Sequence, residues 1–114
     1  MGETNAKNEF MNVTKYLKVI NASIWKRSYD TKKDYIDLLE GYSKEDYEKF
    51  LAKLDFIYDG GYGGQDVYGF IGCEDGVWFD RGEYNGSEWW EKHQYPNIEN
   101  MIKGRILDKL EEND

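Results

Sequence analysis

The sequence has very little cysteine, histidine or proline, since each occurs once in 114 residues. The single cysteine, Cys73, excludes a disulfide bond within the chain, whereas small secreted domains usually depend on several. The first residues lack the basic segment and apolar run of a secretory signal. No apolar stretch approaches the ~18 residues of a membrane-spanning helix. These absences favour a protein of the reducing cytoplasm that does not insert into a membrane.

Basic residues are also scarce. The chain has 15 Lys and Arg against 23 Asp and Glu, which gives a formal net charge of −8. Because clustered Lys and Arg bind phosphate backbones and anionic lipids, this balance argues against direct nucleic-acid or membrane binding. Aromatic residues, by contrast, make up 17% of the chain, more than an acidic disordered segment would contain. Length and composition predict a single acidic, aromatic-rich domain over residues 1–114.

The hydrophobic pattern changes near residue 55. Before it, apolar residues recur at helical spacing, which predicts a helical arm over about residues 7–54. Ser43 is a suitable N-cap within this arm, because Glu45 and Asp46 follow in the first turn. The expected helices cover about residues 7–27, 31–41 and 43–54, with a last amphipathic helix over about 97–111.

From about residue 55 to 94 the pattern indicates an antiparallel sheet. Asp75-Gly76 and Asn85-Gly86 each lie between aromatic and β-branched runs, and such dipeptides favour two-residue hairpin turns. The expected strands are near 66–74, 77–84 and 87–94, with a further one at 55–58. The sequence therefore predicts an α+β fold: N-terminal helices packed on a three- to four-stranded antiparallel β-meander, with a C-terminal helix.

Two-residue turns at both dipeptides would fix which side chains share a sheet face. One face would carry Asp80, Glu91 and His93 together with Cys73 and Ile71. Two opposed carboxylates and an imidazole could perform acid–base chemistry or hold a cation, or could be ordinary surface charges. No Ser-His-Asp arrangement is present, and one His with one Cys cannot build a structural zinc site. We therefore assign no catalytic residue, metal or cofactor.

The opposite face would place Arg81 between Phe70 and Trp90, where a guanidinium can stack on aromatic rings, with Glu83 or Glu88 as its acidic partner. Trp89 and Trp90 are adjacent, so in a strand they point to opposite faces. An exposed tryptophan with tyrosine neighbours is typical of a protein interface. The candidate partner-binding residues are Tyr62, Arg81, Tyr84, Glu88, Trp89 and Trp90.

Tyr62 lies in the glycine-rich segment 59–65, which lacks the Lys-Ser/Thr of a P-loop. We interpret this segment as a loop that presents an aromatic side chain.

Three segments carry a resemblance to a known group of proteins. They are Tyr58–Gln65, Asp75–Trp78 and Arg81–Trp90, of which the last is the most specific. Together they resemble short hypothetical proteins encoded by bacteriophages and prophages, over about residues 55–98. The resemblance implies a phage or mobile-element setting in the host cytoplasm, and it favours a protein that binds host or phage machinery.

The leading hypothesis is a non-enzymatic protein-binding module, in one form an inhibitor of a host defence or nucleic-acid enzyme. Its partner would be a basic or nucleic-acid-binding protein, because carboxylates steer association toward positive charge. Three alternatives remain open. They are an acidic DNA mimic, a small cation-dependent enzyme or ligand-binding domain using Asp80, Glu91 and His93, and a phage assembly component.

Overall fold

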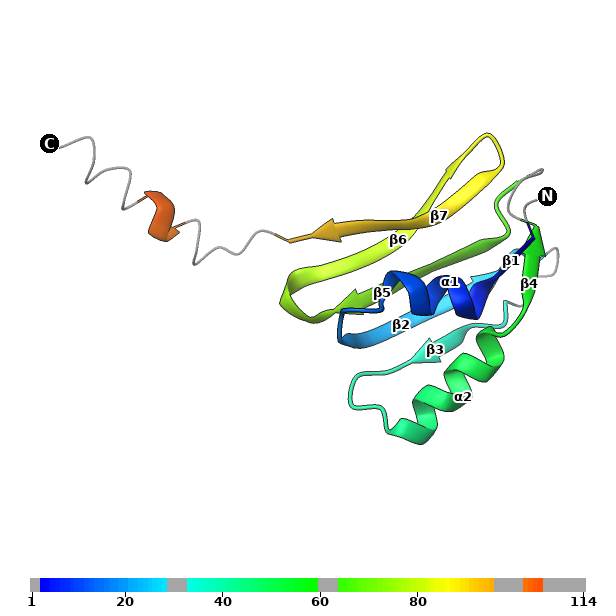
Figure 1. Ribbon diagram of the computed structural model, residues 1–114, viewed down its shortest axis with the longest axis horizontal. Helices are drawn as coiled ribbons and strands as arrows, with labels where there is room; N and C mark the ends of the chain where they lie inside the picture. Colours follow the sequence, from blue (N-terminus) through cyan, green and yellow to red (C-terminus); the bar gives the residue numbers. More distant parts are fainter. Residues whose placement is uncertain (1–2, 29–32, 60–63, 96–101, 106–114) are drawn as a thin grey trace, which may run out of the picture.

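The computed structural model describes residues 3–28, 33–59, 64–95 and 102–105. This part of the chain contains seven strands and two α-helices of eight or more residues, besides short helical turns at Glu74–Gly76 and at residues 102–105 (Figure 1). In order they are β1 (Glu3–Asn5), α1 (Ala6–Val13), β2 (Val19–Lys26), β3 (Ile36–Leu38), α2 (Lys44–Leu54), β4 (Ile57–Asp59), β5 (Val67–Cys73), β6 (Val77–Tyr84) and β7 (Ser87–Gln94).

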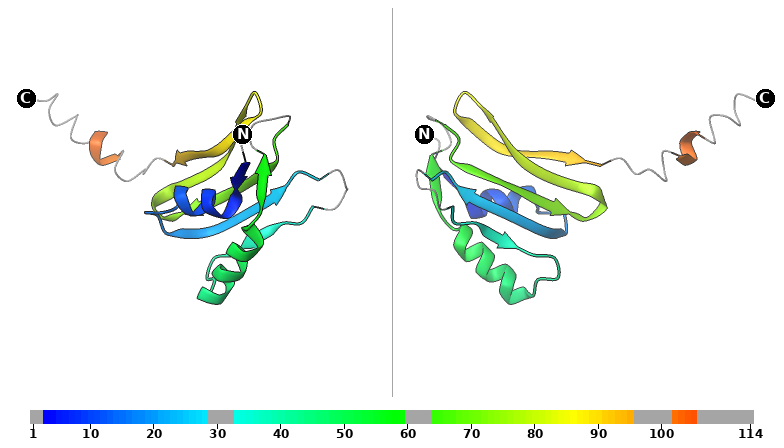
Figure 2. Two further views of the ribbon diagram at one scale, coloured as in Figure 1. Left: turned by 45° about the vertical axis from the view of Figure 1, so that its right-hand side comes forward. Right: turned by 180° about the vertical axis from the view of Figure 1, so that it is seen from behind.

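Five of the strands form one antiparallel sheet in the order β3-β2-β5-β6-β7, and β1 pairs with β4 in a separate two-stranded ribbon. Both helices pack on the same face of the large sheet. Seen from behind in Figure 2, the strands lie in front of α1. Among the described residues, no helix or strand covers that rear face. The α+β class expected from the sequence is confirmed.

The helix predicted over residues 7–27 is correct only in its first third. The Asn5 side chain accepts a hydrogen bond of 3.0 Å from the Asn8 N–H at the start of α1, and the helix ends at Thr14. Residues 19–26 form strand β2 instead. Its burial alternates, with Ala22 and Ile24 buried, and β-branched and aromatic residues suit a pleated sheet. Apolar steps of three and four residues matched a helix and concealed this alternation.

The helix predicted over residues 31–41 is wrong in its described part, because Ile36–Leu38 forms the short edge strand β3. Leu38 pairs with Ala22 and is 2% exposed, whereas the next residue, Leu39, is 74% exposed. Pairing with β2 outweighed the helical spacing. The third helix is confirmed as α2, whose Ser43 N-cap and Asp46 bond each other's backbone N–H groups in a capping box.

The β6–β7 hairpin has the register that the sequence predicts. Asn85 and Gly86 both have positive φ, as a type I′ turn requires, and Asp80 lies opposite Glu91. The β5–β6 connection differs, because Glu74–Gly76 forms a three-residue turn with Asp75 at φ 62°. The extra turn residue shifts β5 by one position, so Phe70 pairs with Asp80. Consequently Ile71 and Cys73 lie on the face opposite to the one predicted.

Two other predicted elements, a fourth strand of the meander and a C-terminal helix, agree with the structure only in part. The strand expected at 55–58 exists as β4, but it pairs with β1 and not with the meander. The helix expected over 97–111 lies largely outside the described residues, of which 102–105 are helical. Tyr62 and the centre of the glycine-rich segment also lie outside them. No helix in the described part of the chain is long and apolar enough to cross a membrane.

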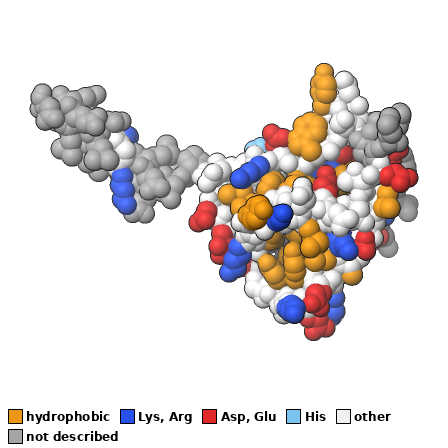
Figure 3. All heavy atoms as spheres, in the orientation of Figure 1, with side chains coloured by type: hydrophobic (Ala, Val, Ile, Leu, Met, Phe, Trp, Pro, Cys, Tyr) orange, Lys and Arg blue, Asp and Glu red, His pale blue; other side chains and the backbone are white. Residues whose placement is uncertain are grey.

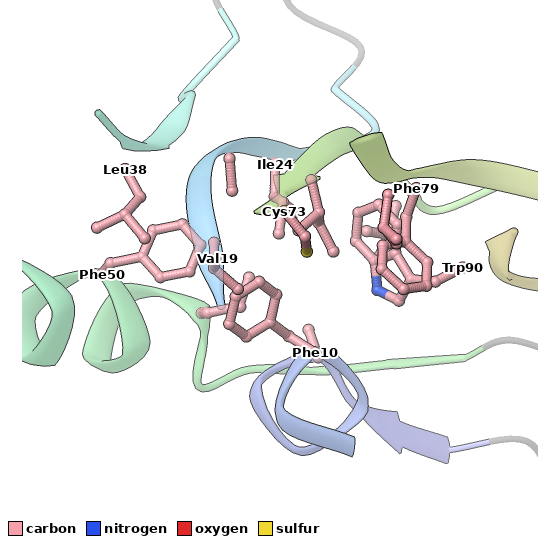
Figure 4. Close-up of a cluster of buried hydrophobic side chains, with 14 of the residues drawn as sticks. Phe10, Val19, Ile24, Leu38, Phe50, Cys73, Phe79 and Trp90 are labelled. Carbon is pink, nitrogen blue, oxygen red and sulfur yellow. The ribbon is translucent and has the colours of Figure 1, made fainter. Parts of the chain in front are cut away.

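The core lies between the helices and one face of the large sheet (Figure 4). Phe10 of α1 meets Phe50 of α2 edge-to-face, with ring centroids 5.2 Å apart. Cys73 is part of this core, and burial raises the pKa of its thiol. Figure 3 views the molecule from the helix side and shows hydrophobic side chains reaching the surface where α1 and α2 meet. The helices and the core thus cover one face of the sheet, and the rear face is not part of this core.

Candidate partner-binding surface

A buried ionic network ties α1, β4 and β7 to strand β6. The Arg81 guanidinium donates to Glu88, to the Glu9 carboxylate at 3.1 Å and to the Tyr58 hydroxyl at 3.1 Å. The Arg81 side chain is 2% exposed and that of Glu88 is 0% exposed. The Glu88 carboxylate also accepts the backbone N–H groups of Asp66 and Val67, at 2.7 and 2.9 Å.

The surroundings within this network raise the pKa values of Arg81 and Tyr58. Burial alone would lower the pKa of Arg81, but Glu9 and hydrogen bonds to Tyr58 and Glu88 raise it above its ordinary value. Burial, followed by the hydrogen bond to Glu9, raises the pKa of Tyr58. The network thus places the Arg81 cation between the side chains of Glu9 and Glu88, beside a neutral phenol, and in the described part of the chain no buried side-chain nitrogen or oxygen lacks a hydrogen-bond partner.

Three of the predicted partner-binding residues are consequently inside the molecule. The side chains of Arg81 and Glu88 are engaged in the network, and Trp90 is 7% exposed, with its ring 4.9 Å from the Arg81 guanidinium carbon. As folded, none of the three presents its side chain to a partner. The sequence predicted the stacking on Trp90 and named Glu88 as one of two possible partners. It was wrong about Phe70, which pairs with Asp80 and lies on the other face of the sheet, and it missed Glu9 and Tyr58.

The rear face of the sheet, which we call the open face, carries the strand residues that alternate with the core. Ile24, Ile71 and Phe79 point toward the helices and are at most 3% exposed, so their strand neighbours point away. Cross-strand pairing places these residues together. The open face comprises Asn21, Ser23, Trp25, Asp37, Tyr68, Phe70, Gly72, Trp78, Asp80, Gly82, Tyr84, Trp89, Glu91 and His93.

Aromatic rings form two groups on the open face. Around Trp25, the Tyr35 ring lies edge-on at 5.1 Å, and the Tyr68 ring lies nearly parallel at 6.2 Å. On the other side of the sheet centre, Trp78 stacks on His93 with ring centroids 4.3 Å apart. Stacking partners hold these rings in fixed orientations. The open face is therefore an ordered aromatic surface.

Three aromatic side chains of the open face remain substantially exposed. Phe70 is 56%, Tyr84 71% and Trp89 39% exposed to solvent. The Trp89 indole lies over Gly82, where an added Cβ would be 2.6 Å from the ring. Its N–H donates to the Glu91 carboxylate. Tyr84 and Trp89 thus lie where a partner could reach them.

A line of residues crosses all five strands through Phe70. Asp37 of β3 pairs with Ser23 of β2, which pairs with Phe70 of β5, then Asp80 of β6 and Glu91 of β7. The Ser23 hydroxyl donates to the Asp37 carboxylate at 2.6 Å. We call Asp37, Asp80 and Glu91 the carboxylate row. None of the open-face strand residues is a lysine or an arginine, and the described cation beside them is Lys33, whose Nζ lies 5.9 Å from the centre of the Trp25 ring.

The side chains of Asp80 and His93 contact each other, whereas the Glu91 carboxylate, although opposite Asp80 in the sheet, is bonded to Trp89 instead. His93 Nε2 lies 2.8 Å from Asp80 Oδ1. Within the described ranges, no group of three or more His, Cys, Asp or Glu side chains could hold a metal ion. The geometry therefore gives more support to a contact surface than to a cation site at these residues.

The sequence-based reasoning missed Trp25 and Asp37 as surface residues, because it assigned both segments to helices. Because of the one-residue error in the β5–β6 register, it also placed Tyr68 and Phe70 on the other face of the sheet from Trp78, whereas the three share the open face. The alternation of apolar and polar residues over Asn21–Trp25 was the available signal for β2.

Comparison of the chain with protein-family models, with curated proteins and with solved structures finds no match.

Proposed function

We propose that the protein is a non-enzymatic protein-binding module whose contact surface is the open face. The observation that carries this proposal is the exposure of Phe70, Tyr84 and Trp89 on a sheet face that no described element covers. Exposed aromatic groups rimmed by polar residues are typical of protein interaction sites. The Phe70 ring packs beside Trp25 and the Trp89 indole is bonded to Glu91, so these two side chains lose little conformational entropy on binding.

The partner under this proposal is a host or phage protein in the host cytoplasm, in keeping with the resemblance to short phage proteins. Inhibition of a host defence or nucleic-acid enzyme is the form of activity we favour. Such enzymes carry basic surfaces for phosphate, and an acidic protein associates with basic surfaces rapidly.

Affinity purification with matched variants tests this proposal. Phe70→Ala/Tyr84→Ala removes two exposed rings from the open face. Met11→Ala/Tyr16→Ala removes two exposed side chains, 46% and 87% accessible, from the α1 region instead. We expect a stoichiometric partner to be recovered with the wild type and the α1 control but lost with the open-face variant. Equal recovery by all three proteins, or no stoichiometric partner, would contradict the proposal.

A further inference from the structure

We infer that the open face recognises a positively charged protein segment, whose arginine or lysine side chains contact the carboxylate row on either side of Phe70. This inference rests on the proposed protein-binding function and adds the chemistry of the partner.

The described residues give the carboxylate row no ion pair with a lysine or an arginine. Asp80 Oδ1 lies 2.8 Å from His93 Nε2, and Asp37 and Glu91 accept hydrogen bonds from the neutral donors Ser23 and Trp89. On the covered side of the same hairpin, by contrast, Glu88 is paired with Arg81. The side chains of Asp80 and His93 are each 37% exposed, so a basic group can approach from solvent. Hydrogen bonds from neutral groups orient these carboxylates without neutralising them.

The spacing of the row defines a simple partner pattern. Neighbouring strands lie ~4.8 Å apart, so Asp37 and Asp80, three strands apart in the sheet, are separated by roughly 14 Å. Phe70 lies between them, next to Asp80. An extended segment rises ~3.3 Å per residue. It would therefore match this row with two basic residues about four positions apart and an apolar residue between them.

The surroundings of Phe70 suit a long basic side chain. A surface depression beside it is lined by Asn21, Ser23, Asp37 and Leu39. Aromatic ring faces attract guanidinium and ammonium groups. The chain itself places a cation at this cluster, because Lys33 Nζ lies 5.9 Å from the centre of the Trp25 ring. An arginine stem could pack on Phe70 while its head group bonds Asp37.

Charge also selects between possible occupants. A second copy of the chain related by a two-fold axis would bring one carboxylate row toward another, and like charges across an interface are unfavourable. A nucleic acid would meet the same repulsion from its phosphates. A basic protein segment is the occupant that the row attracts.

Peptide titration of the full-length protein tests this inference. The probes are nine-residue peptides with two arginines spaced two, three, four or five positions apart around a leucine. Matched peptides carry citrulline, a neutral isostere, in place of arginine. Binding is followed by tryptophan fluorescence and by the backbone amide signals of Ser23, Phe70 and Asp80. We expect the arginine peptides to shift these signals, the four-residue spacing to bind most tightly, and added salt to weaken binding.

Two neutralised variants separate the row from overall charge. Asp37→Asn/Asp80→Asn/Glu91→Gln should weaken binding of the two-arginine peptide about ten-fold, as expected for the loss of two partly exposed ion pairs and of the nearby Glu91 charge. Glu3→Gln/Glu45→Gln/Glu48→Gln removes the same charge from exposed positions of β1 and α2 and should change binding less than about two-fold. Circular dichroism confirms that both variants are folded.

Several results would overturn the inference. They are equal binding of arginine and citrulline peptides, no signal shift with any peptide at millimolar concentration, an equal effect of the two triple variants, or occupation of the face by self-association. If a natural partner still depends on Phe70 and Tyr84 but not on the row, the protein-binding proposal stands and the basic-partner inference fails.

Discussion

Replacing Arg81 by methionine would leave the fully buried carboxylate of Glu88 without its cation. Methionine keeps much of the length and the contact with Trp90, so the main loss is charge and hydrogen bonding. Removing one partner of a buried ion pair costs about 3–5 kcal/mol. Since the folding free energy of a small domain is ~5–15 kcal/mol, this is a large fraction of its stability. The expected fall in melting temperature is about 12 °C or more.

Urea unfolding followed by tryptophan fluorescence measures this loss. Lys18→Met is the control, because its ion pair with Glu74 joins side chains that are 71% and 52% exposed and should contribute less than about 1 kcal/mol. The double variant Arg81→Met/Glu88→Gln should be less destabilised than the sum of its single variants, since the fully buried Glu88 charge is removed with its cation and only Glu9 is left unpaired. If Arg81→Met costs no more than the Lys18 control, the network is not a main support of the fold.

Further expectations concern the sheet, the core and the second helix. Gly69→Ala should destabilise the fold severely in urea, because Gly69 has φ +149° and an added Cβ would lie 2.3 Å from the Ser23 carbonyl oxygen; a near-wild-type midpoint would refute the β2–β5 pairing. Cys73 should react with a disulfide reagent at least ~100-fold more slowly in the folded than in the unfolded protein, because the residue is 5% exposed and burial also raises the pKa of its thiol. Hydrogen bonds from the Ser43 backbone and side chain lower the pKa of Asp46 below its ordinary 3.8. The ionised form therefore stabilises the fold above about pH 4. The difference in unfolding free energy between wild type and Asp46→Asn should shrink as the pH falls below about 4; a constant difference from pH 6 to pH 2 would contradict the capping box.

Local signals in the sequence predicted some of these elements well. Ser43 with Asp46 marked the start of α2, and Asn85-Gly86 fixed the β6–β7 register, because each signal acts within a few residues. Residues 19–26 were harder, since their apolar spacing fits both a helix and a strand. Pairing with β5 decides between the two, and this contact lies far along the chain.

The candidate site was predictable in part for the same reason. The pairing of Asp80 with Glu91 follows from a two-residue turn. The face on which Phe70 lies depends instead on whether Glu74 belongs to strand β5 or to the turn between β5 and β6. The contact between Arg81 and Glu9 joins residues 72 positions apart, and no local pattern announces it. Arg81, which the sequence predicted as a partner-binding residue, is therefore a buried residue that stabilises the fold.

Hydroxyl-radical footprinting of the protein with and without its co-purified partner tests the central claim most directly, because exposed aromatic side chains and methionine are oxidised in proportion to their access to solvent. Phe70, Tyr84 and Trp89 report on the open face, while Tyr16 and Met11 report on the helix side within the same molecule. We predict that the partner protects the first three several-fold and leaves Tyr16 and Met11 unchanged. Protection of Tyr16 and Met11, with Phe70 and Trp89 oxidised as before, would contradict the account.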